Sequence, residues 1–185
     1  MIRKKVNDYV KYCSGFSLIE LLIIITIAAI IATIGIPAFS TWIPDYRLRN
    51  IAKELYADMY LAKMKAIKEN KKYKIIFATG SNESYSLINA DGVIEKMVTI
   101  STSGSGQGIS FGCGNATKSA KKAGGPPPDD GISYNDNVVT FNSRGTGSTG
   151  YLYIYNSKGT SYAVGTLSSG VILIKKWDKT GNCWK

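Results

Sequence analysis

Histidine is absent from the 185 residues of the chain. Its absence excludes catalytic triads with an imidazole base and most zinc sites, because histidine is a common ligand there. Cysteines number three, and the acidic residues are scattered, so no metal-ligand spacing is found. No set of side chains matches a catalytic constellation. We therefore expect neither an enzyme nor a site for a metal or cofactor.

A nucleotide site is not indicated either. GTGSTG, residues 145–150, matches the pattern G-x-G-x-x-G, which needs a strand before it and a helix after it. Here YLYIYN follows, and its composition predicts a strand. The glycines at 145–150 therefore indicate a turn.

Long apolar runs are scarce. The chain has one, FSLIELLIIITIAAIIATIGIPAF, residues 16–39, and no comparable run follows Tyr46. That run has about the 20 residues that cross a hydrocarbon core. It predicts one membrane-spanning segment, residues 16–43. Residues 1–15 carry four basic side chains and one acidic one, and positive charge beside a first span holds that end in the cytoplasm. The following domain is therefore expected on the exported side.

Glu20 is the one charged side chain in this run. A carboxylate at that depth costs roughly 2.5–3.5 kcal/mol. Secretory signals carry small residues after their apolar region, whereas Gly15 stands before it. Cleavage between Gly15 and Phe16 would create a positively charged amine about one helical turn from Glu20. The amine of a neighbouring subunit is the better-placed partner if helices are staggered, so we expect association through this helix.

An amphipathic helix is predicted over residues 44–72, because a first stripe of apolar residues recurs there at steps of three and four. The members of this stripe are Leu48, Ile51, Ala52, Leu55, Met59, Ala62 and Ala66. Proline removes a helical hydrogen bond, so we expect a bend or an unwound stretch between Gly35 and Pro44, which includes Pro37. A second apolar stripe predicts broad coverage of the helix on one side. Its members are Tyr56, Tyr60, Met64 and Ile67.

Residues 73–185 change to strand periodicity, with a Gly/Ser/Pro-rich loop over residues 101–131 between two strand groups. We expect little core from this loop, because Gly, Ser and Pro dominate its composition. A loop of this length is usually functional or disordered. The predicted fold class is α+β, a long N-terminal helix packed on an antiparallel β-sheet domain of two strand groups. The predicted strands are residues 73–78, 84–89 and 93–100, then 137–141, 151–156, 161–167 and 170–177.

One feature of the second group concerns side chains. Alternating Tyr151, Tyr153 and Tyr155 indicate a half-buried sheet face rather than a binding platform.

Cleavage after residue 15 would leave Cys113 and Cys183 as a pair. Export into an oxidising compartment favours a disulfide, which closes about 70 residues and contributes roughly 4 kcal/mol on the chain-entropy model. The alternative is two free thiols.

The sequence GFSLIELLIIITIAAIIATIGIPAF, residues 15–39, resembles the signature of type IV prepilins. The resemblance implies a pilin-like fold and a prepilin peptidase that cuts after Gly15 and methylates the amine of Phe16. It implies that Glu20 pairs with a neighbouring subunit's amine during assembly. It also implies that the helix unwinds at Pro37 within filaments.

Two further segments, AKELYADMYLAKMKAIKENKKYKIIF and VVTFNSRGTGS with the later SSGVILIKKW, resemble the GspH/FimT branch of pseudopilins and minor pilins. The branch implies a minor subunit of a type II secretion pseudopilus or a type IV pilus, which initiates or caps the filament or serves protein secretion. The implied partners are other pilin subunits, the prepilin peptidase and the bacterial inner membrane. A single pass would leave the C-terminal domain in the periplasm.

Two alternatives stay open, a major pilin and a minor pilin that binds DNA for natural transformation. Members of the branch often carry arginine directly after the last glycine, whereas this chain has Val171. DNA binding by lysines would weaken steeply with salt. The bases to test are Lys118, Lys121, Lys122, Lys175, Lys176, Lys179 and Lys185.

Overall fold

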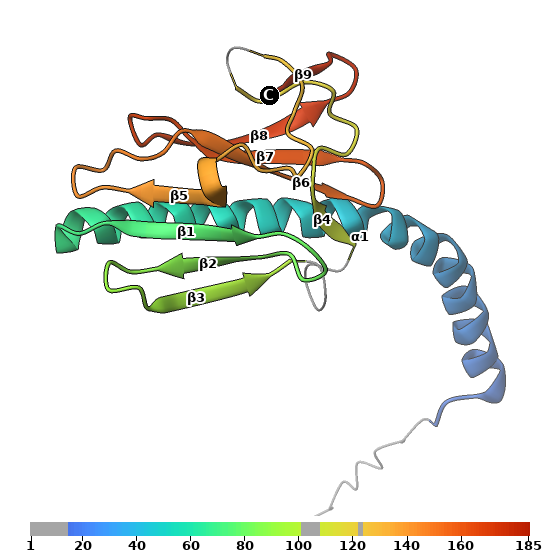
Figure 1. Ribbon diagram of the computed structural model, residues 1–185. Helices are drawn as coiled ribbons and strands as arrows, with labels where there is room; N and C mark the ends of the chain where they lie inside the picture. The colour runs from blue at the N-terminus through green and yellow to red at the C-terminus, as the bar shows by residue number, and fades with distance from the viewer. Residues whose placement is uncertain (1–14, 101–107, 122–123) are drawn as a thin grey trace, which may run out of the picture. The chain divides into compact units, whose positions relative to one another are not determined.

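The computed structural model describes residues 15–100, 108–121 and 124–185 (Figure 1). Two compact units divide the chain, Met1–Ser40 and Thr41–Lys185. Helix α1, Leu18–Glu69, contributes residues to both units. Its backbone stays helical through Gly35, Pro37 and Pro44, so the expectation of an unwound stretch is wrong for this structure.

In the first unit, the large apolar side chains of α1 that the structure describes are exposed. Leu18 is 81% exposed, and even Leu22 is 46% exposed. Two threonines, Thr26 and Thr33, donate their hydroxyls to helix carbonyls one turn earlier, so neither hydroxyl is left without a partner. By length and hydropathy together, no helix in the described part of the chain qualifies as a membrane span.

Helix α1 ends in a Schellman motif. Asn70 adopts the left-handed conformation, with φ at 53°. Its amide donates to the carbonyl of Ile67 at 3.3 Å, and the amide of Lys71 donates to the carbonyl of Ala66 at 3.2 Å. These bonds satisfy carbonyls that the end of the helix would leave open. The sequence predicted an end near this residue.

The second unit contains two antiparallel sheets, and residues of α1 share one core with both of them (Figure 1). A short 3₁₀ helix, η2 (Asn135–Asn137), precedes β5. The four-stranded sheet has the order β3-β2-β1-β5, with β1 Tyr73–Ala78, β2 Ser84–Ile88, β3 Ile94–Thr99 and β5 Val138–Phe141. The five-stranded sheet has the order β4-β6-β7-β8-β9, with β4 Ile109–Phe111, β6 Gly150–Asn156, β7 Ser161–Thr166, β8 Ile172–Asp178 and β9 Cys183–Trp184.

The predicted α+β class is confirmed, and each predicted strand is present, with its ends within two residues of the predicted ones. The predicted grouping is wrong for β5, which pairs with β1 so that Tyr73 faces Phe141. Strand β4 falls in the loop predicted over residues 101–131 and pairs with β6. Strand β9 was also not predicted, and it extends the same sheet from β8.

One hydrophobic core joins α1 to both sheets. Leu55 and Met59 of the helix are fully buried, as are Ile75 of β1 and Leu152 of β6. The first helical stripe predicted from the sequence is buried in full: Leu48, Ile51, Ala52, Leu55, Met59, Ala62 and Ala66. The second stripe is wrong as a buried face, because its members are between 37% and 52% exposed: Tyr56, Tyr60, Met64 and Ile67.

A buried carboxylate links α1 to the first sheet. Asp58, 6% exposed, accepts a hydrogen bond of 2.6 Å from the hydroxyl of Tyr85. The ammonium of Lys96 lies 2.8 Å and 2.9 Å from the two carboxylate oxygens and 3.0 Å from Glu54. Burial lowers the pKa of Lys96, but its hydrogen bonds to Asp58 and Glu54 outweigh that effect and raise it. No pattern in the sequence indicated this network, which stabilises the helix on strands β2 and β3.

Replacing Tyr85 with phenylalanine is expected to lower the free energy of unfolding by about 1.5–3 kcal/mol, because the hydroxyl bonds a charged, buried carboxylate. Burial, followed by the bond to Asp58, also raises the pKa of Tyr85. Chemical denaturation of the full chain in a mild detergent measures the change. The matched control is Tyr56→Phe, at a helix position that is 37% exposed, where the change should stay within about 0.5 kcal/mol. Equal effects of the two substitutions would contradict the role of the buried network.

Candidate functional site

The residues predicted for processing and assembly lie at or just before the start of α1. Gly15, Phe16 and Ser17 precede the helix, whose first turn is closed by a bond of 3.1 Å from the amide of Leu21 to the carbonyl of Ser17. Phe16 is 75% exposed. Glu20 lies exposed in the first turn, where the helix dipole favours a carboxylate. Both the predicted cleavage position and the carboxylate are therefore accessible in the isolated chain.

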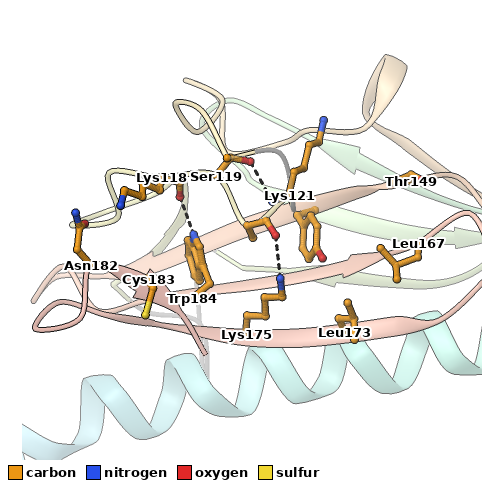
Figure 2. Close-up of a pocket in the computed structure, with 13 residues that line it drawn as sticks. Lys118, Ser119, Lys121, Thr149, Leu167, Leu173, Lys175, Asn182, Cys183 and Trp184 are labelled. Atoms are coloured by element: carbon orange, nitrogen blue, oxygen red, sulfur yellow. Dashed lines mark hydrogen bonds between the residues drawn. The ribbon is translucent and has the colours of Figure 1, made fainter.

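The predicted basic residues divide into separate places. Lys118, Lys121 and Lys175 line one hollow of about 700 Å³ on the five-stranded sheet (Figure 2). Lys176 follows Lys175 on β8, and alternation along a strand places its side chain on the opposite face. Lys185 forms an ion pair with Asp178.

Two predicted bases remain, Lys179 and Lys122. Lys179 is exposed in the turn between β8 and β9 and does not line the hollow. Lys122 lies outside the described residues. Of the six predicted bases that the structure describes, Lys118, Lys121 and Lys175 line the hollow, and Lys176, Lys179 and Lys185 do not.

The hollow has a wall of chain segments that are hydrogen-bonded to one another. The indole nitrogen of Trp184 donates to the carbonyl of Lys118 at 2.6 Å. The ammonium of Lys175 donates to the carbonyl of Ala120 at 2.9 Å (Figure 2). The hydroxyl of Thr117 donates to the side chain of Asn182 at 2.8 Å. These bonds hold residues 117–120 against β8 and β9, so the hollow is formed before any ligand arrives.

The tyrosine face of the second sheet is a small second core. Tyr151 and Tyr153 are 2% and 0% exposed, because residues of the segment after β4 cover them. The hydroxyl of Tyr153 bonds Ser119 at 2.9 Å and accepts from the amide of Ala120 at 2.8 Å. Burial raises the pKa of Tyr153. The tyrosines lie on a sheet face as predicted, but Tyr151 and Tyr153 are buried rather than half-buried. The loop was wrongly expected to add little core.

The predicted disulfide is not formed in the structure, where both thiols are free. Cys113 is half-buried and its sulfur lies 3.6 Å from the carbonyl of Pro128, whereas Cys183 is exposed on β9. Burial, followed by the charges of Asp130 and Asp129, raises the pKa of Cys113 to about 11. Such a thiol stays protonated near neutral pH and is a poor nucleophile. We therefore withdraw the disulfide.

Sequence reasoning missed the apolar part of the hollow, which comes from Leu167, Leu173 and Trp184. Period-two alternation in ILIKKW places Leu173 and Lys175 on one face of β8, and this signal was available. The position of Trp184 could not be predicted from the sequence, because it depends on the pairing of a two-residue strand with Trp177.

Comparisons with known proteins agree with the motif and the domain. A model of the prokaryotic N-terminal methylation motif matches residues 10–36, and a model of the type II transport protein GspH matches residues 52–170. A similar solved structure is the minor pseudopilin EpsH from the type 2 secretion system of Vibrio cholerae. Its identity is 13% and its TM-score 0.46, with 69% of this chain and 95% of that chain covered. No curated protein matches the chain. Since the GspH match spans more than half of the sequence, the chain belongs to the GspH family of type II transport proteins.

Proposed function

We propose that this protein is a minor subunit of a type II secretion pseudopilus and joins the filament through its N-terminal helix. Family membership and the methylation motif support the assignment. The observation that carries it is the first part of α1, where large apolar side chains lie exposed around a lone carboxylate, Glu20. A related filament, the type IV pilus, offers the same helix environment and is the nearest alternative setting.

Two environments can cover the exposed apolar residues. Before assembly, the segment predicted as residues 16–43 inserts in the bacterial inner membrane, with the domain from Pro44 onward in the periplasm. After assembly, helices of neighbouring subunits take the place of lipid. Burying a leucine or isoleucine side chain contributes about 1.5–3 kcal/mol, so the segment needs one of these partners at every stage.

Glu20 sets the register between the N-terminal helices of neighbouring subunits. Cleavage after Gly15 produces a charged amine on Phe16, and a buried carboxylate requires such a cation nearby. A neighbouring subunit supplies that amine when the helices are staggered. Pro37 lies in the same segment and is the position where the helix would unwind inside a filament. The helix is continuous there in the isolated chain.

The role we infer is mechanical, in initiating or capping the filament, and the prepilin peptidase acts on the protein. A DNA-binding minor pilin is the weaker hypothesis, because Lys175 and Lys176 point to opposite faces of β8 and the ammonium of Lys185 is engaged by Asp178. A major pilin is the third hypothesis. Abundance in sheared filaments separates it from a minor subunit.

Replacing Gly15 with valine is expected to leave residues 1–15 attached, because a branched side chain at the scissile bond should block the peptidase. Intact-mass measurement of the protein from membranes should give the precursor mass alone. The wild-type chain should give the processed mass plus one methyl group. The control is Gly92→Asn at a surface turn with φ at 82°, where open space surrounds the residue and processing should be complete. A processed Gly15→Val chain would contradict the assignment of the cleavage site.

A further inference from the structure

The hollow on the outer face of the five-stranded sheet has an uneven charge. Three lysines line it, Lys118, Lys121 and Lys175, and none of the described lining residues is acidic. Lys118 and Lys121 are exposed at its rim. Figure 2 shows the ammonium of Lys121 extending away from the sheet. Such a site attracts an anion, and the charge alone does not say which kind.

The apolar lining narrows the choice of anion. Leu167 is 37% exposed and Leu173 is half-buried, so aliphatic surface is open in the hollow. Its volume of about 700 Å³ is within the range of sites for small ligands and side chains. An inorganic anion would leave this aliphatic surface uncovered. The ligand should therefore carry an apolar side chain next to its acidic groups.

The aromatic residues in the hollow are already in use. The ammonium of Lys175 lies 5.3 Å from the centre of the Tyr151 ring, which is buried. The indole of Trp184 packs against Tyr153 at 5.5 Å and Trp177 at 5.2 Å between ring centres. Binding of single-stranded nucleic acid depends on bases stacking on open aromatic faces. This arrangement therefore favours a peptide over a nucleic acid.

We propose that the hollow is a docking site for an acidic peptide segment of a partner protein, in which an aliphatic side chain is flanked by carboxylates. The aliphatic side chain contacts Leu167 and Leu173, and the carboxylates meet Lys118 and Lys121 at the rim. Lys175 retains two N–H donors beside its bond to Ala120 and closes the inner end. This proposal is independent of how the N-terminal helix assembles.

The test measures binding of a labelled pentapeptide, one leucine between two pairs of acidic residues, to the full chain in detergent by fluorescence anisotropy. The double variant Lys118→Glu with Lys121→Glu should bind roughly tenfold more weakly or worse, a loss of about 1.4 kcal/mol. Leu167→Gln should also weaken binding, since it removes apolar contact at an exposed position. The charge-matched control, Lys176→Glu with Lys179→Glu, should bind within about twofold of wild type, because neither residue lines the hollow.

Two comparison probes make the result specific. A pentapeptide with serine in place of leucine should bind more weakly than the parent peptide, which supports the apolar contact. Equal losses in the two double variants would overturn the proposal, because binding would then follow net charge and not the hollow. Tighter binding of a labelled five-residue oligothymidylate, lost in the Lys118/Lys121 variant alone, would also overturn it and assign the site to nucleic acid. No binding of the peptide by wild type would overturn it directly.

Discussion

Replacing Glu20 with leucine is expected to remove the protein from sheared filaments while leaving it in the membrane. The carboxylate lies in the first turn of α1 among exposed apolar side chains. In a filament those side chains become buried, and a buried carboxylate is stable only beside a cation. Breaking a buried ion pair from one side costs roughly 3–5 kcal/mol. Incorporation should therefore fall by roughly 150- to 4000-fold.

Membrane retention distinguishes assembly from insertion. Loss of the charge should favour insertion, since a carboxylate in the span costs roughly 2.5–3.5 kcal/mol. Immunoblots of membrane and sheared-filament fractions from the same cells measure both effects. Glu20→Gln keeps the shape without the charge and should fail like leucine. Asp136→Asn is the charge-matched control, because Asp136 is exposed at a left-handed position that asparagine adopts. Wild-type incorporation of the leucine variant would refute the pairing.

The sequence predicted most of the elements because the signals for them are local. Alternation in YKIIFA and the Asp91-Gly92 turn mark β1 and the β2–β3 hairpin. In that hairpin, the side chain of Asn89 accepts from the amides of Asp91 and Val93 at 3.0 Å and 2.9 Å. Likewise, the residues of the prepilin signature are adjacent in the sequence, so Gly15 and Glu20 needed no tertiary information.

The errors come from contacts between distant residues. Val138–Phe141 is a strand by composition, but only packing decides that it pairs with β1 and not with the second sheet. The Gly-rich loop contains Ala120, 3% exposed, because it lies over the tyrosines of β6. The number of cysteines suggested a disulfide, but cysteine count carries no geometry. The hollow was not predicted for the same reason, because the residues that line it lie as far apart in the sequence as Lys118 and Trp184.

Gly165 shows how such distant contacts constrain a single position. It lies in β7 opposite Tyr151 of β6, and a Cβ added there would lie 2.2 Å from the carbonyl oxygen of Gly150 and 2.3 Å from the Tyr151 ring. Neither neighbour is free to move. On the other side of β6, the amide of Tyr151 donates to the hydroxyl of Ser133 at 2.8 Å. The ring is buried beneath Lys175.

Replacing Gly165 with alanine is therefore expected to lower the free energy of unfolding by about 3 kcal/mol or more, at the upper end for overpacked sites. For a unit of this size the melting temperature should fall by about 6–12 °C. Calorimetry or circular dichroism on the full chain in detergent measures the shift. The control is Gly92→Asn, at a turn where nothing lies within 4 Å of an added Cβ, and it should change the melting temperature by no more than about 2–4 °C.

The same substitution tests the connection between the core and the hollow. Tyr151 forms part of the lining of the hollow, so a displaced ring should carry Lys175 with it and weaken binding of the acidic peptide. Gly92→Asn should leave peptide binding unchanged. A Gly165→Ala chain with the melting temperature of wild type would contradict the close packing of β6 on β7. A chain that is destabilised but binds the peptide as wild type does would show that the hollow depends on its rim lysines and leucines and not on the position of Tyr151.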